Sequence, residues 1–171
     1  MSLGLYLHIP YCFSKCRYCD FYSAPGQRGV PRAYVDALLR ELSRFAPDAP
    51  LRPDTLYFGG GTPSLLDPAD AARLIAAAQP LPGAEITLEA NPETVTEDSL
   101  QAFREAGVNR ISFGVQSARD SQLKTLGRPH TAKQARAAFA AASIISPTRM
   151  ETMHRAAAQT PRAAKSAVTR I

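Results

Sequence analysis

All three cysteines of the 171-residue chain lie within eight positions, in the segment Y-C-F-S-K-C-R-Y-C-D-F-Y at residues 11–22. Cys12, Cys16 and Cys19 follow the spacing C-x3-C-x2-C. Thiolates ligate metals, so three of them on one short loop can surround a compact metal centre. A [4Fe–4S] cluster normally takes four cysteines, and a set of three leaves one iron free to bind a small molecule.

Zinc is the main alternative for these thiols. A structural zinc site takes four protein ligands, and the nearest candidate for the fourth is His8. No second C-x-x-C or H-x-x-x-H pair follows, so a zinc site and free thiols both stay open beside the cluster. An odd, clustered set of cysteines is not typical of the disulfide framework of secreted proteins, so we expect a cytoplasmic location.

The elements around the cysteines alternate between strands and helices. Apolar patterning predicts strands at residues 3–9, 55–58, 85–89 and 110–115. Helical periodicity, N-caps and stop signals predict helices at residues 30–45, from 67 to about 79, after Thr96 up to Gly107, at 117–126 and at 131–143. This order, at about the spacing of βαβ units, predicts a parallel sheet with right-handed crossovers.

The polar and glycine-rich candidates all follow predicted strands. They are the cysteine segment, the triple glycine at residues 59–61, Glu89 and Gln116. In parallel α/β sheets and β/α barrels, ligands bind at the carboxyl ends of the strands. We therefore expect these four features to converge on one face of the domain.

Composition limits the remaining classes of function. The net charge is +5, but the segment 144–171 carries +4 of it, and the body shows no interleaving of basic and aromatic residues. We therefore expect no nucleic-acid partner. There is no apolar run of eighteen residues, so we expect no membrane span, and the N-terminus lacks the basic region and cleavage site of a signal peptide.

The cysteine segment resembles a known family. L-Y-L-H-I-P-Y-C-F-S-K-C-R-Y-C-D-F, at residues 5–21, is similar to the opening of radical S-adenosylmethionine (SAM) enzymes, with Tyr18 as the aromatic residue before the last cysteine. It is most similar to the group of oxygen-independent coproporphyrinogen III oxidase and its heme-chaperone relative. The similarity runs in order over residues 3–142. Its further motifs are F-G-G-G-T-P at 58–63, L-E-A-N-P at 88–92, R-I-S-F-G-V-Q-S at 110–117 and L-x-x-L-G-R-x-H at 123–130.

The resemblance implies a fold and a set of site residues. The fold is α/β, the N-terminal part of a radical SAM partial (β/α)6 barrel with about four parallel strands and flanking helices. Cys12, Cys16 and Cys19 hold a [4Fe–4S] cluster, and SAM chelates the fourth iron through its amino and carboxylate groups. The residues implied to contact the cofactors are Tyr6, Tyr18, Gly60, Gly61, Thr62, Glu89, Gln116 and Arg128.

Each of these residues also has an ordinary structural interpretation. Gly60 and Gly61 could form a strand-to-helix turn, Glu89 could be a solvated acid, and Arg128 could be an exposed arginine at a helix end. We expect His8 to be a strand histidine with a satisfied partner and His130 to be structural. Asp20 and Phe21 are expected to shape the cysteine segment.

Two features favour the heme-chaperone branch of the group. The chain starts only a few residues before the first strand, and Asp20-Phe21 follows Cys19 where the oxidases typically carry Gly-Cys. This branch implies heme or a porphyrin as ligand, a heme-acceptor protein and an electron donor. The alternatives are coproporphyrinogen III dehydrogenase, a zinc-binding module and an inactive fragment, so the resemblance leaves open whether this chain is an enzyme.

The similarity ends near residue 143. The family continues with a fifth strand that bears a SAM-contacting aspartate, whereas residues 144–171 show no strand pattern, no matching motif and a basic bias. We therefore predict a partial core domain at residues 1–143 and a divergent, disordered tail at 144–171, as a frameshift would produce. Without the rest of the barrel, the fourth strand would have an uncovered edge.

Overall fold

A computed structural model describes residues 2–45, 50–145 and 151–152. Its centre is a parallel sheet in which the strands lie in chain order, β1 to β5. The strands are β1 (Gly4–Ile9), β2 (Thr55–Gly60), β3 (Glu85–Ala90), β4 (Arg110–Phe113) and β5 (Glu151–Thr152). The predicted α/β class with four parallel strands is confirmed.

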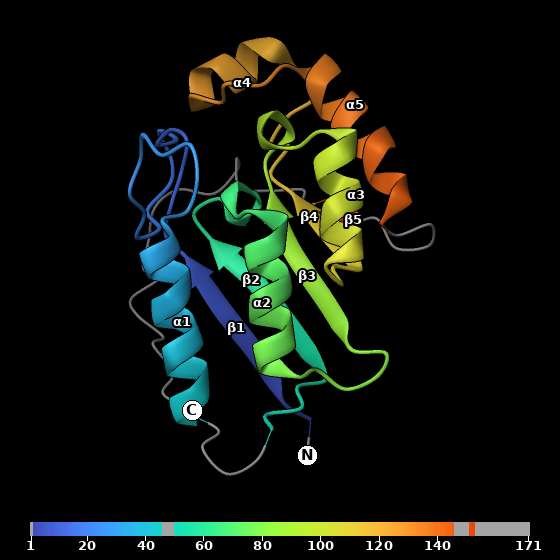
Figure 1. Ribbon diagram of the computed structural model, residues 1–171. Helices are drawn as coiled ribbons and strands as arrows, with labels where there is room; N and C mark the ends of the chain where they lie inside the picture. The colour runs from blue at the N-terminus through green and yellow to red at the C-terminus, as the bar shows by residue number, and fades with distance from the viewer. Residues whose placement is uncertain (1, 46–49, 146–150, 153–171) are drawn as a thin grey trace.

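The helices follow the strands in turn. They are α1 (Arg32–Phe45), α2 (Pro68–Ala78), α3 (Glu97–Glu105), α4 (Asp120–Leu126) and α5 (Ala132–Ala141), with short 3-10 turns η1 (Pro63–Leu65), η2 (Pro92–Thr94) and η3 (Ala142–Ile144). Figure 1 shows α1, α2 and α3 side by side over the same face of the sheet. A sheet with sequential strands and helices on one face is the arrangement of a β/α barrel wall.

The two faces of the sheet differ in polarity because successive side chains on a strand point to opposite faces. One set packs with the helices in the core: Leu7, Ile9, Leu56, Phe58, Ile86, Leu88, Ala90, Ile111 and Phe113. The alternate set is largely polar: Tyr6, His8, Tyr57, Thr87, Glu89 and Ser112. Parallel sheets covered on both faces are usually apolar on both. The polar face is therefore typical of a barrel interior that takes ligands.

The predicted capping residues start the helices as expected. The Asp67 carboxylate accepts from the N–H of Ala69, and the Thr96 hydroxyl accepts from the N–H of Ser99. Gly107 stops the segment after α3 with φ +110°, a left-handed conformation that favours glycine. These local interactions explain why the sequence placed most of the elements correctly.

Two boundaries near the fourth strand were wrong. The strand ends at Phe113 rather than at residue 115, because the N–H of Val115 donates back to the Phe113 carbonyl in a tight turn and the chain leaves the sheet. The next helix begins at Asp120 rather than at residue 117, since the Ser117 hydroxyl accepts from the N–H of Arg119 and forms a turn.

A short strand after residue 143 was not predicted from the sequence. Glu151 and Thr152 form β5, which pairs with β4 in the register Ser112 to Glu151 and Phe113 to Thr152. A parallel edge has unpaired backbone groups, and this short pairing satisfies part of it. Two residues are too few to show a strand pattern in the sequence. The predicted disorder of the tail otherwise falls on residues outside the described part.

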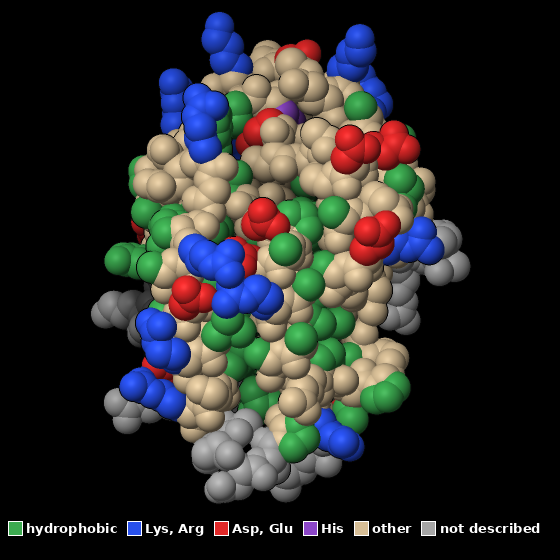
Figure 2. Space-filling view, in the orientation of Figure 1, with side chains coloured by type: hydrophobic (Ala, Val, Ile, Leu, Met, Phe, Trp, Pro, Cys, Tyr) green, Lys and Arg blue, Asp and Glu red, His purple; other side chains and the backbone are tan. Residues whose placement is uncertain are grey.

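The surface over the helices carries both signs of charge. Figure 2 shows acidic and basic side chains mixed on this face. Arg73, for example, donates to Asp36 and Asp70, each at 2.8 Å. Within the described residues, no helix is both long and apolar enough to cross a membrane.

Candidate functional site

The cysteine loop, defined here as residues 10–31 between β1 and α1, folds back on itself. The N–H of Cys12 donates to the Ala24 carbonyl at 3.0 Å. The Lys15 ammonium crosses the loop and donates to the Phe21 carbonyl at 2.7 Å. These contacts hold the thiol-bearing segment as a closed turn at the carboxyl end of β1.

The three thiols are free but do not surround a single point. Cys12 is buried, and Cys16 and Cys19 are half-buried. Among the described residues, no group of three His, Cys, Asp or Glu side chains comes together as ligands of one metal ion. A zinc ion needs its sulfur ligands at about 2.3 Å, whereas the cysteines of a [4Fe–4S] cluster can each ligate a different iron.

His8, the suggested fourth zinc ligand, has other partners. Its Nδ1 lies 3.4 Å from the Tyr6 hydroxyl, and its Nε2 lies 3.3 Å from the Tyr22 carbonyl oxygen. This confirms the expectation of a strand histidine with a satisfied partner. His8 thereby connects β1 to the far end of the cysteine loop.

The glycine motif lies directly against the cysteine loop. The N–H of Gly61 donates to the Ile9 carbonyl at 2.8 Å, and the N–H of Thr62 donates to the Tyr11 carbonyl at 2.7 Å. A Cβ on Gly61 would lie 2.6 Å from the Tyr11 oxygen and 2.9 Å from the Cys12 sulfur. The residue at this position must therefore be glycine for the two loops to meet.

Gly60 is constrained for a second reason. Its φ of +119° is rarely adopted by other residues, and a Cβ there would lie 2.6 Å from the His8 ring. Its N–H donates to Glu89 Oε2 at 3.0 Å, and the Tyr57 hydroxyl donates to Oε1 at 2.8 Å. Burial, followed by the hydrogen bond to Glu89, raises the pKa of Tyr57 to about 12. Glu89 thus joins β2 to β3 at the edge that carries the glycines.

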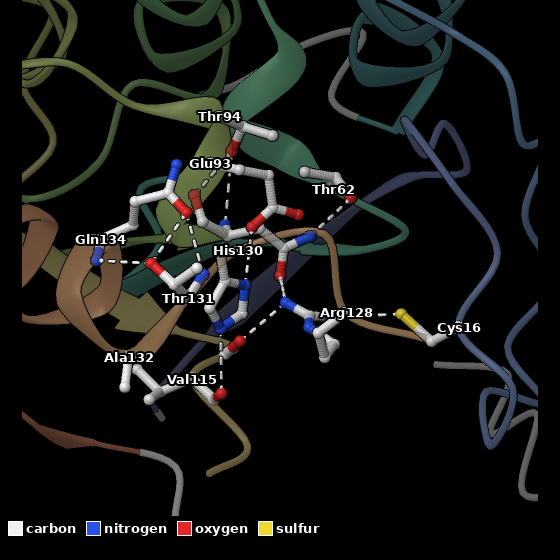
Figure 3. Close-up of polar contacts among 12 residues, drawn as sticks. Cys16, Thr62, Glu93, Thr94, Val115, Arg128, His130, Thr131, Ala132 and Gln134 are labelled. Atoms are coloured by element: carbon white, nitrogen blue, oxygen red, sulfur yellow. Dashed lines mark hydrogen bonds and ion pairs between the residues drawn. The ribbon is translucent and has the colours of Figure 1, made fainter. Parts of the chain in front are cut away.

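Arg128 spans the site from α4 to the cysteine loop. Its Nη1 donates to Cys16 Sγ at 3.1 Å, and its Nη2 donates to the Gly114 carbonyl at 2.6 Å and to Asn91 Oδ1. The Asn91 amide nitrogen in turn donates to the Thr62 hydroxyl at 3.1 Å. Figure 3 shows Arg128 reaching toward Cys16, with Thr62 on the neighbouring loop. One polar network therefore connects the Cys16 thiol, the glycine motif and the end of β3.

The charge of Arg128 indicates that the site accepts an anion. The residue is only 9% exposed, and within the described residues its guanidinium faces no carboxylate. Its Nε is buried with no hydrogen-bond partner there. Burying an unpaired charge or donor is costly, so such groups are normally satisfied. A carboxylate-bearing ligand and thiolates at the cysteines would both satisfy this cation, so the residues fit SAM beside a cluster.

Tyr18 lies at the same junction. Burial is the main cause that raises its pKa to about 12, and its hydroxyl also interacts with Cys16 and Arg128. The aromatic residue of the cysteine motif therefore contacts the network of Arg128 rather than standing apart in solvent. Tyr6 lies farther down the polar face, stacked on Tyr57 with ring centroids 5.8 Å apart. Its pKa is raised by burial and by the charge of Glu89.

Gln116 follows β4 in the left-handed conformation, with φ +66°. Strained backbone of this kind in a non-glycine residue is common at ligand sites. Gln116 lines a cavity of about 340 Å³ with residues of α4 and the turn before it, namely Ser117, Ser121, Gln122, Thr125 and Leu126. Most of these side chains end in a hydroxyl or an amide, while apolar atoms form the larger part of the cavity surface, so the cavity offers hydrogen-bonding groups within a mainly apolar wall.

His130 forms a contact that sequence reasoning did not find. Its Nδ1 lies 2.9 Å from Glu93 Oε2, and its Nε2 lies 3.1 Å from the Val115 carbonyl oxygen. Both partners carry acceptor oxygens, and which ring nitrogen donates to which of them depends on the tautomer of the imidazole. At 2% exposed, His130 joins the segments after β3, β4 and α4 (Figure 3). Its predicted structural role agrees with this position.

Asn91 and Gly114 were also missed as site residues. A Cβ on Gly114 would lie 2.6 Å from Asn91 Oδ1 and 3.2 Å from Arg128 Nη2. Both residues belong to motifs that the sequence shows, L-E-A-N-P and R-I-S-F-G-V-Q-S, and only the spatial position of Arg128 reveals their role. We define the site floor as residues 59–62, 89–94 and 114–116 together with Arg128 and His130.

A profile of the Radical SAM superfamily matches residues 6–150. The match covers most of the chain, which therefore belongs to the radical SAM superfamily. Heme chaperone HemW of Escherichia coli (strain K12) is 47% identical over 147 residues, which cover 82% of this chain and 39% of that protein. Radical S-adenosyl methionine domain-containing protein 1, mitochondrial, of Bos taurus is 40% identical over 157 residues, which cover 86% of this chain and 34% of that protein.

Solved structures agree with this membership. Coproporphyrinogen III oxidase (HemN) from Escherichia coli, described as a radical SAM enzyme, has a TM-score of 0.77 and 31% identity, covering 86% of this chain and 35% of that one. The cobalamin-dependent SAM radical enzyme OxsB has a TM-score of 0.53 at 19% identity, covering 82% of this chain and 22% of that one, a likeness of fold alone. The chain spans less than half the length of the curated relatives it matches.

The comparisons confirm the predicted family and the predicted part of the fold. Family membership implies SAM and a [4Fe–4S] cluster as cofactors. The individual roles of the cysteines, Tyr6, Tyr18, Gly60, Gly61, Thr62, Glu89, Gln116 and Arg128 stay predictions, to which the geometry above adds physical reasons.

Proposed function

We propose that this chain is the N-terminal part of a heme-chaperone type of radical SAM protein, which binds a [4Fe–4S] cluster, SAM and heme. The observation that carries the proposal is the meeting of the cysteine loop with a buried, carboxylate-free Arg128 at the carboxyl ends of the strands. This arrangement offers three thiols on one loop, one of which receives a hydrogen bond from a buried cation. It suits a metal centre beside a small anionic ligand.

Cys12, Cys16 and Cys19 would hold the cluster, with one iron left for SAM. In its reduced form the bound cluster supplies the electron for cleavage of SAM. The role of the polypeptide would be to bind and orient the cluster and SAM. The Arg128 guanidinium would lie beside the SAM carboxylate, to which its charge and planar shape are suited. Gly61 keeps the backbone close to the Cys12 thiol. Gly60, Gly61 and Thr62 would bring backbone groups close to the methionyl part of SAM.

Glu89, Gln116 and the two tyrosines complete the proposed SAM site. The Glu89 carboxylate is already fixed by two donors and can accept a further hydrogen bond. Gln116 has an amide that can both donate and accept at ribose hydroxyls, and it lines the cavity beside α4. Tyr18 would stand beside the cluster and Tyr6 on the polar face below it.

Heme binding is proposed from the relatives. The chain is 47% identical to HemW, whose name states a heme chaperone, and 31% identical to HemN. Asp20-Phe21 after Cys19 agrees with the chaperone branch. The second candidate is coproporphyrinogen III dehydrogenase activity, which the fold similarity to HemN favours. For the chaperone we further propose a heme-acceptor protein, an electron donor and a cytoplasmic location, with the core domain at residues 1–143.

Anaerobic reconstitution with iron and sulfide tests the proposal. We expect the chain to take up a [4Fe–4S] cluster whose electron paramagnetic resonance spectrum, after reduction, changes when SAM is added. Stoichiometric zinc at the cysteines and no such cluster would instead favour the zinc-binding module. A chain that holds neither would be the inactive fragment.

Two ligands then separate the chaperone from the dehydrogenase. Titration with heme should give a saturable change in the heme absorption spectrum for the chaperone. Turnover of coproporphyrinogen III in the presence of SAM and a reductant, without heme binding, would support the dehydrogenase and contradict the chaperone.

A further inference from the structure

Cys16 differs from the other two cysteines in its surroundings. Arg128, 112 positions away in the chain, donates from Nη1 to Cys16 Sγ at 3.1 Å (Figure 3). In the part of the chain that the structure describes, Cys12 and Cys19 receive no hydrogen bond from a side-chain nitrogen. One sulfur of the three therefore carries a charged donor.

The guanidinium cannot easily leave this position. Its Nη2 is tied to Asn91 and to the Gly114 carbonyl, and the absence of a side chain on Gly114 makes room for both. Arg128 is also more than nine-tenths buried, where electrostatic interactions are stronger than in water. The donor at Cys16 is thus fixed by three segments far apart in sequence.

We propose that Arg128, besides its proposed contact with SAM, tunes the reduction potential of the cluster through its hydrogen bond to Cys16. Hydrogen bonds to the ligating sulfurs and the burial of a cluster are among the factors that set its potential. Reduction adds one negative charge to the cluster, and a fixed cationic donor at one sulfur stabilises that charge. The contact therefore raises the potential. This inference rests on the proposed function.

A redox titration without SAM tests the inference. Dithionite supplies the single electron that converts the [4Fe–4S] cluster from the 2+ to the 1+ state, and electron paramagnetic resonance measures the reduced fraction. We expect Arg128→Gln to lower the midpoint potential relative to the unmodified chain. Arg128→Lys keeps the charge but loses the planar donor, so its potential should lie between the two.

Arg17→Gln is the matched control. Arg17 is adjacent to Cys16 in sequence but is exposed, and its Nη1 donates at 3.5 Å to the Thr125 carbonyl rather than to a sulfur. The control removes the same charge from the residue next to Cys16 without removing a donor to its sulfur, and we expect a smaller shift. An unchanged potential in Arg128→Gln, or an equal shift in Arg17→Gln, would overturn the proposal.

A second measurement needs no variant, in case Arg128→Gln does not fold or take up a cluster. In the unmodified chain, exchange into heavy water should shift the iron–cysteine stretching bands in the resonance Raman spectrum, because the proton donated to Cys16 is exchangeable. Bands that do not move would contradict the inference while leaving the proposed function standing. A chain that assembles no [4Fe–4S] cluster would instead overturn the proposed function and this inference with it.

Discussion

The cysteine loop leaves its aromatic side chains largely in solvent, whereas the site floor buries its polar groups in hydrogen bonds to one another. In the loop, Phe21 is 65% and Tyr22 is 86% exposed. In the floor, Thr62, Arg128 and His130 are buried and each has a defined partner.

This difference indicates that the two regions gain their order from different sources. The floor is fixed by contacts between β2, β3, β4 and the segment after α4, so the polypeptide alone prepares it. Preorganised groups of this kind bind a ligand without the cost of ordering them. The cysteine loop has few buried apolar contacts of its own, and regions of that type open most readily. We infer that the cluster, once bound, supplies the order that the loop lacks.

The largest expected effect falls on metal binding and not on stability. Cys19→Ala removes one thiolate of the loop without touching the floor. We expect the iron bound after reconstitution to fall to background, while the free energy of unfolding of the cluster-free protein changes by less than about 0.5 kcal/mol. Iron analysis and urea denaturation check the two quantities. A large loss of stability would mean that the loop is as integral to the fold as the floor.

The floor should show the opposite response. His130→Ala leaves the Glu93 carboxylate, 14% exposed, without its partner. Leaving a buried acceptor without its hydrogen-bond donor costs about 1–3 kcal/mol, and we expect a loss in this range in urea denaturation. The control is Glu41→Ala, which breaks a surface pair with Arg44 of similar length, 2.8 Å, and should cost less than about 0.5 kcal/mol. Equal effects of the two substitutions would contradict the proposed rigidity of the floor.

The contact between the two regions can be broken at one residue. Gly61→Ala places a methyl group against the Tyr11 carbonyl and the Cys12 sulfur. Overpacking of this kind costs about 1–3 kcal/mol, and we expect both reduced stability and reduced iron uptake. Gly29→Ala is the control, because its nearest new contact, the Leu65 carbonyl oxygen, lies at an ordinary 3.9 Å. Normal iron uptake by Gly61→Ala would mean that the loops need not touch.

A smaller effect concerns the pH dependence of the floor. Burial and Glu89 raise the pKa of Tyr57 to about 12, above the ordinary tyrosine value of about 10. The protonated phenol therefore contributes stability that is fully present below about pH 10 and is lost as the pH rises through about 12. We expect Tyr57→Phe to flatten the alkaline fall in stability over this window. An unchanged alkaline fall in urea denaturation would show that Tyr57 is not the group responsible.

The fold was easier to predict than the site because its signals are local. The helix caps at Asp67 and Thr96 and the helix stop at Gly107 act within a few residues. The strands are likewise indicated by the apolar patterning of their own residues. The two-residue β5 has no such local signal and was missed.

The site depends on contacts between distant segments. The sequence identified Cys16 and Arg128 separately, but their hydrogen bond spans 112 positions. Glu93 and His130 are 37 positions apart, and no sequence pattern predicts that their side chains meet. The family motifs predicted most of the site residues. Only the structure shows that Arg128 is buried and that no carboxylate among the described residues pairs with it.

Hydrogen exchange of the chain before and after anaerobic cluster assembly tests the central claim most directly. We predict that backbone amides of the cysteine loop gain strong protection when the cluster binds, and that amides of the site floor are already protected in the cluster-free protein. Adding SAM should then increase protection only around the carboxyl ends of β2, β3 and β4. A loop as protected as the floor before cluster assembly, or unchanged after it, would contradict the account.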